Sequence, residues 1–265
     1  ADMIWGVSVS GNYAYVNQRS GLWIVDISNI FNPVPLGRYD TPSFIDDLFI
    51  SGNYAYVTNR RNGLFIIDIS DPANPSLETT YHTEGWVSSI FISGDYAFVG
   101  EDSLLILEIS DPSSPNLIGS CGSVGSLQDI FVSDGYAFAL GDFVVHIIDV
   151  SEPSQPTLTS SYYATRGQAG SICVAGDYAY VTFYEWYGDY GVLQIIDISN
   201  PDDPLFAGSY DTPGYATKVC VDGDYTFVAD IQSLMILQFS PTGAEEEIVG
   251  TPHSFSLSPN YPNPF

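Results

Sequence analysis

Short apolar runs recur along the whole chain and are separated by Gly, Asn, Asp and Pro. The first runs are rich in Val, Ile and aromatic residues, which favour the pleated, partly buried surface of a β-sheet. Gly11 and Asn12 lie between two runs and predict a tight hairpin, because these residues tolerate a positive φ. Pro33 and Pro35 follow the third run, and proline cannot donate to a neighbouring strand. We therefore expect four strands near 5–10, 13–18, 22–27 and 34–40.

This four-strand pattern repeats six times. The segment SGNYAYV (10–16) recurs, with small changes, at 51–57, 93–99, 133–139, 175–181 and 222–228. The tyrosines that mark it are spaced 41, 42, 40, 42 and 47 residues apart: Tyr13, Tyr54, Tyr96, Tyr136, Tyr178 and Tyr225. Four strands at this period are the size of one propeller blade. Strands that are apolar on both faces are expected where each sheet lies between two others.

The repeat predicts an all-β, six-bladed β-propeller with four antiparallel strands per blade. The propeller covers residues 1–250, in units at about 1–43, 44–85, 86–125, 126–167, 168–214 and 215–250. A Pro-rich tail follows at 251–265. The sixth unit shows only three clear strands, ending near Phe239. Its fourth strand must come from 244–250, from the SFSL segment of the tail, or from another molecule.

A second recurring block resembles a known family. GLWIVDIS (21–28), GLFIIDIS (63–70), VVHIIDVS (144–151) and LQIIDIS (193–199) mark the third strands, and turns such as SDPANP (70–75) follow them. Block, spacing and turn together are similar to the LVIVD repeat family of bacterial and archaeal surface or secreted proteins, over about residues 1–240. Glu108 and Gln238 depart from the recurring Asp. The resemblance implies an extracellular propeller whose biochemical role is mostly unassigned. We separately expect its partners to be itself, other surface proteins or glycans.

The tail carries a second resemblance. SLSPNYPNPF (256–265), which ends in Tyr261, Pro262, Asn263, Pro264 and Phe265, is similar to the opening of the C-terminal sorting domain of type IX secretion. This likeness implies a bacterial protein that is extracellular or attached to the outer cell surface. The alternative is an ordinary Pro-rich linker.

The charge balance excludes two classes of partner. Six Lys and Arg stand against 32 Asp and Glu, a formal net charge of -26. Such a field repels phosphate backbones and anionic lipid surfaces, so we expect no nucleic acid partner and no membrane-surface binding. The chain has no run of 18 apolar residues that would predict a transmembrane helix.

Three carboxylates stand just before innermost strands, at Asp46, Asp47 and Asp129, with Lys218 at the matching place in the sixth unit. They are candidate oxygen ligands for Ca²⁺, and a calcium-assisted hydrolase or lyase would be the enzymatic interpretation. The alternative is a hydrated polar channel mouth. No catalytic motif accompanies them, and we expect no enzyme and no required cofactor.

Other residues that could carry chemistry have structural explanations. Asp26, Asp68, Asp149 and Asp197 recur in most units, so we expect them to bond backbone amides of the following turn. His146 alternates with apolar neighbours and predicts a hydrogen-bonded histidine inside a strand. We expect Cys173 and Cys220 to be buried free thiols. Cys121, in a Gly- and Ser-rich stretch, is expected to be exposed.

The fifth unit breaks the repeat with an insertion, TFYEWYGDYGV (182–192). It places Phe183, Tyr184, Trp186, Tyr187 and Tyr190 around two acids. Aromatic residues gathered on a loop are typical of contact surfaces and could stack on sugar rings or hold a protein partner. The alternative is a loop folded onto its own blade.

The sequence thus leaves two functions open. The first is a secreted or cell-surface structural and interaction protein, without catalysis, that assembles into a filament or surface polymer through its tail and blade edges. The second is an extracellular ligand-binding module that uses the 182–192 loop for a glycan or a protein.

Overall fold

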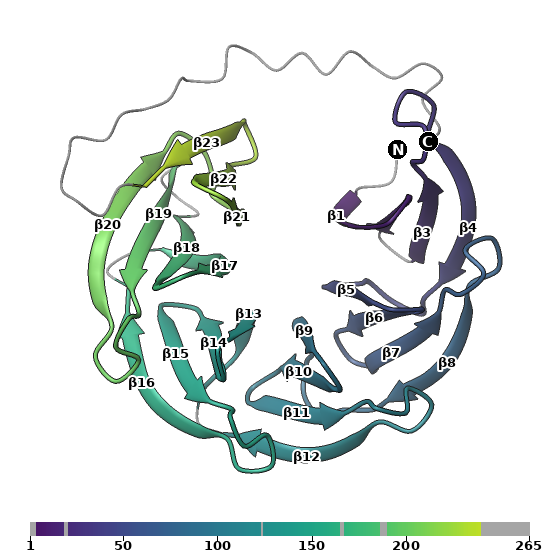
Figure 1. Cartoon of the computed structure of the whole chain (residues 1–265), viewed down its shortest axis with the longest axis horizontal. Helices are drawn as coiled ribbons and strands as arrows, with labels where there is room; N and C mark the ends of the chain where they lie inside the picture. The colour runs from purple at the N-terminus through teal and green to yellow at the C-terminus, as the bar shows by residue number, and fades with distance from the viewer. Residues whose placement is uncertain (1–3, 19–20, 123, 165–166, 186–189, 240–265) are drawn as a thin grey trace. The chain divides into compact units, whose positions relative to one another are not determined.

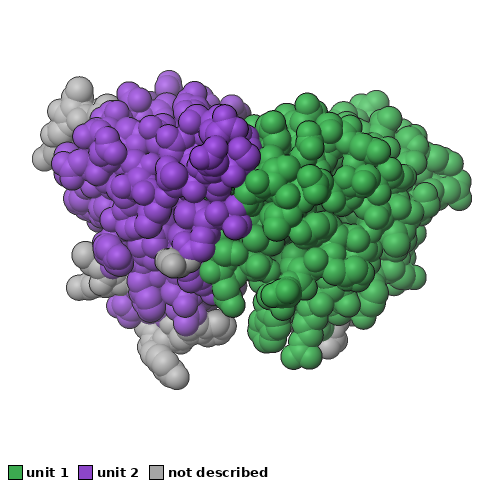
Figure 2. Space-filling model, turned by 90° about the horizontal axis from the view of Figure 1, so that it is seen from below, with its two compact units in different colours: residues 1–119, 256–265 green, residues 120–255 purple. Residues whose placement is uncertain are grey.

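The computed structural model describes residues 4–18, 21–122, 124–164, 167–185 and 190–239. The regular elements in these ranges are all β-strands. They form six antiparallel sheets in which each strand is hydrogen-bonded to the next strand in sequence (Figure 1). The chain is therefore an all-β, six-bladed propeller, as the repeat predicts. It divides into two compact units of three blades each, coloured separately in Figure 2.

The first unit holds blades 1 to 3. Blade 1 contains β1 (Ile4–Ser10), β2 (Tyr13–Gln18), β3 (Gly21–Asp26) and β4 (Val34–Asp40). Blade 2 contains β5 (Leu48–Ser51), β6 (Tyr54–Asn59), β7 (Gly63–Asp68) and β8 (Ser76–Tyr81). Blade 3 contains β9 (Ser89–Ser93), β10 (Tyr96–Gly100), β11 (Leu104–Glu108) and β12 (Asn116–Cys121).

The second unit holds blades 4 to 6. Blade 4 contains β13 (Leu127–Ser133), β14 (Tyr136–Gly141), β15 (Val144–Asp149) and β16 (Thr157–Tyr163). Blade 5 contains β17 (Gln168–Ala175), β18 (Tyr178–Glu185), β19 (Tyr190–Asp197) and β20 (Leu205–Thr212). Blade 6 contains, among the described residues, β21 (Lys218–Asp222), β22 (Tyr225–Ala229) and β23 (Leu234–Gln238).

The first hairpin of every blade closes through a two-residue turn. Five of these turns begin with a glycine at a positive φ of 55 to 58°, such as Gly11, which is the geometry of a type II′ turn. Blade 4 carries Asp134-Gly135 instead, and both residues have a positive φ, as in a type I′ turn. Either turn matches the right-handed twist of the flanking strands.

The cores lie between neighbouring blades of a unit. In blade 2, Val57 and Ile67 pack against residues of blade 1, whereas Leu64 and Ile66 pack against residues of blade 3. In blade 5, Phe183 packs with residues of blade 4, and Leu193 packs with residues of blade 6. Because successive side chains of a strand point to opposite faces, a blade with two covered faces needs apolar residues at consecutive positions.

The fourth strand of a blade also contacts the Pro-bounded turn of the next blade in the same unit. A Cβ added at Gly37 would lie 2.2 Å from the carbonyl oxygen of Pro72 in blade 2, so only glycine fits there. In the second unit, the Ser160 hydroxyl donates to the Pro201 carbonyl of blade 5 at 2.6 Å. These contacts give the recurring S-N/D-P-x-x-P turn a packing role.

Candidate functional site

The recurring aspartates at the ends of the third strands are structural, as predicted. Asp26, Asp68, Asp149 and Asp197, here called the turn aspartates, each accept a hydrogen bond from the backbone N–H two residues later, at 2.8 to 2.9 Å. Hydrogen bonds from Ser28, Ser70, Ser151 and Ser199 stabilise the ionised form and lower the pKa of each carboxyl. These four carboxylates hold the turns and are not available as a catalytic set.

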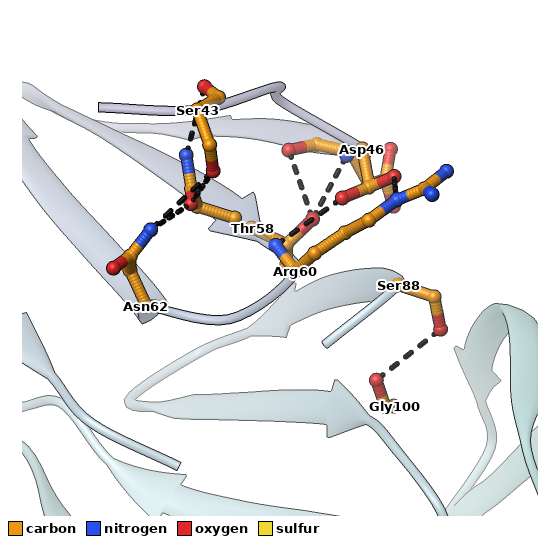
Figure 3. Close-up of polar contacts among 9 residues, drawn as sticks. Ser43, Asp46, Thr58, Arg60, Asn62, Ser88 and Gly100 are labelled. Carbon is orange, nitrogen blue, oxygen red and sulfur yellow. Dashed lines mark hydrogen bonds and ion pairs between the residues drawn. The ribbon is translucent and has the colours of Figure 1, made fainter. Parts of the chain in front are cut away.

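In the first unit, Asp46 and Asp47 are both committed to protein partners. The Asp46 carboxylate accepts from the Arg60 Nε at 2.7 Å and from the Arg60 backbone N–H at 3.2 Å (Figure 3). The Asp47 carboxylate accepts from the Leu48 N–H at 2.9 Å and, across the blade boundary, from the Ile90 N–H at 3.0 Å. Beside them, Ser43 and Asn62 both donate to the side-chain oxygen of Asn59.

In the second unit, Asp129 occupies the position in blade 4 that Asp47 has in blade 2. One carboxylate oxygen accepts from the Ser171 hydroxyl at 2.7 Å and from the Ile172 N–H at 3.0 Å. The Lys218 ammonium lies 3.6 Å from the same oxygen. Both Ser171 and Ile172 belong to blade 5, so Asp129 links two blades and approaches the third.

These bonds have a common physical reason. The first strand of a blade is an edge of its sheet, and its outward N–H groups have no strand partner. Asp47 and Asp129 supply an acceptor to one such N–H in the following blade. The described residues contain no group of three His, Cys, Asp or Glu side chains placed to hold a metal ion. The structure therefore gives Asp46, Asp47 and Asp129 roles in stabilising blades, and calcium binding by them stays a prediction.

His146 is the hydrogen-bonded strand histidine that its sequence context predicts. It is buried, its Nδ1 lies 2.9 Å from the Ser161 hydroxyl, and burial lowers its pKa. The predictions for two cysteines are wrong. Cys121 is 7% exposed, because it takes the inward-facing place that Tyr81 has in blade 2, whereas Cys220 is exposed on the face of β21 opposite Val219. Cys173 is buried, as expected.

The insertion in blade 5 lengthens a hairpin. Strands β18 and β19 each have 8 residues, compared with 6 in β14 and β15 of blade 4. The added pairs are Tyr184 with Gly191 and Glu185 with Tyr190. The hairpin therefore extends beyond the end that the other blades share, and its additional side chains can form a site that the repeat alone does not provide.

A pocket of about 210 Å³ lies at this extension. The described residues that line it are Gly167, Phe183, Tyr184, Glu185, Tyr190, Gly191, Val192, Gln194, Ser209 and Asp211. The strand register explains why they meet. Phe183 pairs with Val192, Val192 with Asp211, and Gln194 with Ser209, so these side chains share one face of blade 5. The pocket has an apolar floor of Phe183 and Val192, with polar side chains around it.

Two tyrosines of the insertion are fixed in different ways. The Tyr190 hydroxyl donates to a Glu185 carboxylate oxygen at 2.8 Å, and its ring is 36% exposed. Tyr184 packs edge-on against Tyr215, with 5.9 Å between the ring centroids. Burial, with a smaller contribution from the charge of Asp142, raises the pKa of Tyr184. The Tyr184 phenol is therefore a neutral hydrogen-bonding group at physiological pH.

The structure brings together three of the five aromatic residues predicted as a binding loop: Phe183, Tyr184 and Tyr190. Phe183 is fully buried and forms part of the floor. Trp186 and Tyr187 lie outside the described residues, as does the predicted assembly tail at 261–265. The sequence did not point to Gln194, Ser209 and Asp211, although their alternation in β19 and β20 places them on the same face as Val192.

The repeated blades and the pocket of blade 5 define an all-β propeller with one specialised blade. The LVIVD repeat model matches residues 3–41, 45–83, 84–123, 124–164, 166–212 and 213–240. The chain belongs to the LVIVD repeat family. The part of it that the structure describes has no helix long and apolar enough to cross a membrane.

Solved structures share the fold at low sequence identity. A putative 6-phosphogluconolactonase from Bacteroides uniformis is 12% identical, with a TM-score of 0.76 over 87% of this chain and 78% of that one. A periplasmic gluconolactonase from Pseudomonas aeruginosa is 12% identical, with a TM-score of 0.74 over 89% and 81%. A functionally unknown protein from Desulfotomaculum acetoxidans is 14% identical, with a TM-score of 0.71 over 89% and 82%. A search of curated proteins finds no match.

Proposed function

We propose that this LVIVD-repeat propeller is a non-catalytic binding protein, extracellular or on the outer surface of a bacterial cell, that holds a glycan in the pocket of blade 5. The observation that supports this proposal is the pocket itself, which lies where one blade departs from the repeat. Features shared by all blades serve packing, whereas a feature confined to one blade is free to serve a ligand.

The lining chemistry suits a sugar ring. Sugars combine an apolar ring face with hydroxyl groups, and the pocket combines an apolar floor with two phenols, an amide, a hydroxyl and two carboxylates. Its volume of about 210 Å³ is below the roughly 300–1,000 Å³ of sites for drug-sized ligands, which favours one ring of a longer chain. Tyr190 and Asp211 are exposed to solvent, so the rest of the glycan can extend outward from the pocket.

The same lining supports binding without turnover. General acid–base and nucleophilic catalysis need a proton-transfer group beside a reacting atom, commonly His, Cys or Lys or a matched carboxyl pair. The lining residues within the described part of the chain include no His, Cys or Lys. The Glu185 carboxylate accepts from Tyr190, which fits a positioning role for that acid. A bound oligosaccharide is therefore expected to be recovered intact after prolonged incubation.

The test is a panel of immobilised glycans, followed by calorimetry on those that bind. Tyr190→Ala removes an exposed aromatic wall, and we expect affinity to fall about tenfold or more, the size typical of an aromatic anchor. Phe143→Ala is the matched control, because Phe143 is exposed at the equivalent hairpin of blade 4 and does not line the pocket. Failure of every glycan to bind, or equal loss in both variants, would contradict the proposal.

A second candidate function is self-assembly into a filament or surface polymer. The observation that favours it is the edge of blade 6. Among the described residues, β23 pairs only with β22, whereas β3, β7, β11, β15 and β19 each also bond a fourth strand. An edge strand can accept a strand from another copy, and a head-to-tail contact of this kind builds rings or filaments. Size-exclusion chromatography and electron microscopy, with and without residues 251–265, test it: a monomer in both forms would exclude assembly through the tail.

A further inference from the structure

The pocket of blade 5 has a one-sided charge. Glu185 and Asp211 are its charged lining residues, and both are acidic. The whole chain has only six Lys and Arg, and none of the lining residues that the structure describes is Lys or Arg. The remaining polar lining groups are neutral. An anionic sugar, such as a uronic acid or a sulfated sugar, would therefore meet two negative charges among the described lining residues.

The two carboxylates lie on opposite sides of the apolar floor. Glu185 is on β18 and Asp211 is on β20, with β19 between them. Two strand spacings correspond to roughly 10 Å between the backbones at these positions. Val192 on β19 lies between the two strands that carry the carboxylates, and Phe183 is buried beside it on β18. A sugar ring resting on the floor thus presents its substituents to a carboxylate at either side.

Building on the proposed function, we propose that the glycan is built of amino sugars with free amines, a hexosamine polymer from which the acetyl groups are missing. Its protonated amines are cations with three N–H donors each, and they pair with carboxylates by charge-assisted hydrogen bonds. The acetylated form has neither the charge nor these donors. The net charge of -26 also attracts a cationic polymer to the protein over a longer range.

The experiment uses three tetrasaccharides with the same β-1,4 linkage: glucosamine, N-acetylglucosamine and glucose. Calorimetry on the whole protein at pH 6 and low salt should show the glucosamine tetramer binding at least about fivefold more tightly than the other two. Raising the salt concentration should weaken binding of the glucosamine tetramer more than binding of the other two, because salt screens the attraction between its amines and the carboxylates. Analysis of the sugars after incubation checks that each remains intact.

Two isosteric variants locate the preference. Glu185→Gln removes the charge but keeps an acceptor for the Tyr190 hydroxyl. Asp211→Asn removes the charge at the other side of the pocket. We expect each to lower the ratio of the affinity for the glucosamine tetramer to the affinity for the glucose tetramer, because the charge pair is lost. Asp203→Asn, in the exposed turn of the same blade, is the control and should change neither.

The outcomes separate this inference from the proposed function. A glucose or N-acetylglucosamine tetramer that binds as tightly as the glucosamine tetramer would overturn the amine preference and leave glycan binding standing. An amine preference that survives in both variants would also overturn it, because the charge pair would then lie elsewhere. No binding of any tetramer, together with a negative glycan panel, would overturn both.

Discussion

Replacement of Asp129 by alanine tests how neighbouring blades of the second unit are joined. In the wild-type protein this carboxylate accepts from the Ser171 hydroxyl and the Ile172 N–H, both in blade 5. Ile172 is 4% exposed, so water cannot easily replace the lost acceptor. The variant would leave a buried backbone donor unpaired, and a buried donor without a partner costs more than an average hydrogen bond is worth.

The expected loss of stability follows from these contacts. An unpaired buried N–H costs about 1–3 kcal/mol, and loss of the Ser171 bond adds about 1 kcal/mol. Lys218 contributes little, because its side chain is 61% exposed and such pairs are screened by solvent. The total is about 3 kcal/mol, which corresponds to a decrease in Tm of about 6–12 °C for a domain of this size.

Differential scanning calorimetry and urea unfolding measure this loss. Asp203→Ala, an exposed acid in a turn of blade 5, is the control and should change stability by less than about 0.5 kcal/mol. Ser171→Ala and the double variant complete a cycle that isolates the Asp129–Ser171 coupling. A stability of Asp129→Ala within about 0.5 kcal/mol of wild type would refute the reasoning. So would a Ca²⁺-dependent rise in Tm that Asp129→Ala abolishes, because Asp129 would then act as a metal ligand.

Three further predictions concern conformation, thiols and pH. Gly167→Ala should lower the free energy of unfolding in urea by about 1–3 kcal/mol and weaken glycan binding. Gly167 has a φ of +82°, and an added Cβ would lie 3.1 Å from the Phe183 side chain. Unchanged binding and stability would contradict this. A thiol reagent should label Cys220 in the native state and reach Cys121 and Cys173 only on unfolding, because Cys220 is exposed and the other two are buried. Equal labelling of the three thiols by mass spectrometry would contradict this. The turn aspartates have a folded pKa below the unfolded value, so the stability they contribute is complete above the unfolded pKa and is lost as pH falls below about 4 through the folded pKa. Urea unfolding at several pH values should show that the stability of Asp149→Ala falls less steeply with acid than that of the wild type. An equal fall in both proteins would count against this.

Most of the fold could be predicted from the sequence because each blade repeats the same pattern of apolar strands and turn residues. Strand ends near Gly11 and Pro33 are set by turn chemistry that acts over a few residues, and the predicted strands of blade 1 agree with β1 to β4 within one residue at each end. The role of the turn aspartates was also predictable, because their bonds span only two residues.

The contacts between blades were harder to predict, because they depend on register across segments some 40 residues apart. The bond from the Ile172 N–H to Asp129 joins residues separated by 43 positions. Cys121 was predicted to be exposed from its Gly- and Ser-rich neighbours, although alignment with Tyr81 would have placed it on the inward face. In the pocket, Asp211 and Gln194 could be placed on the face of Val192 only once the register of β19 and β20 was known.

The acidic residues Asp47 and Asp129 and the acid Glu185 of the blade 5 insertion differ in whether their position needs a ligand to explain it. Asp47 and Asp129 stand at a position that every blade has, and each satisfies a backbone donor that a propeller must satisfy in some way. Their presence is explained by the fold. Glu185 stands at an extension that blade 4 does without, so blade packing does not require it. An acidic side chain retained where packing does not require it is the better place to look for a ligand, and the charge of that ligand should be positive.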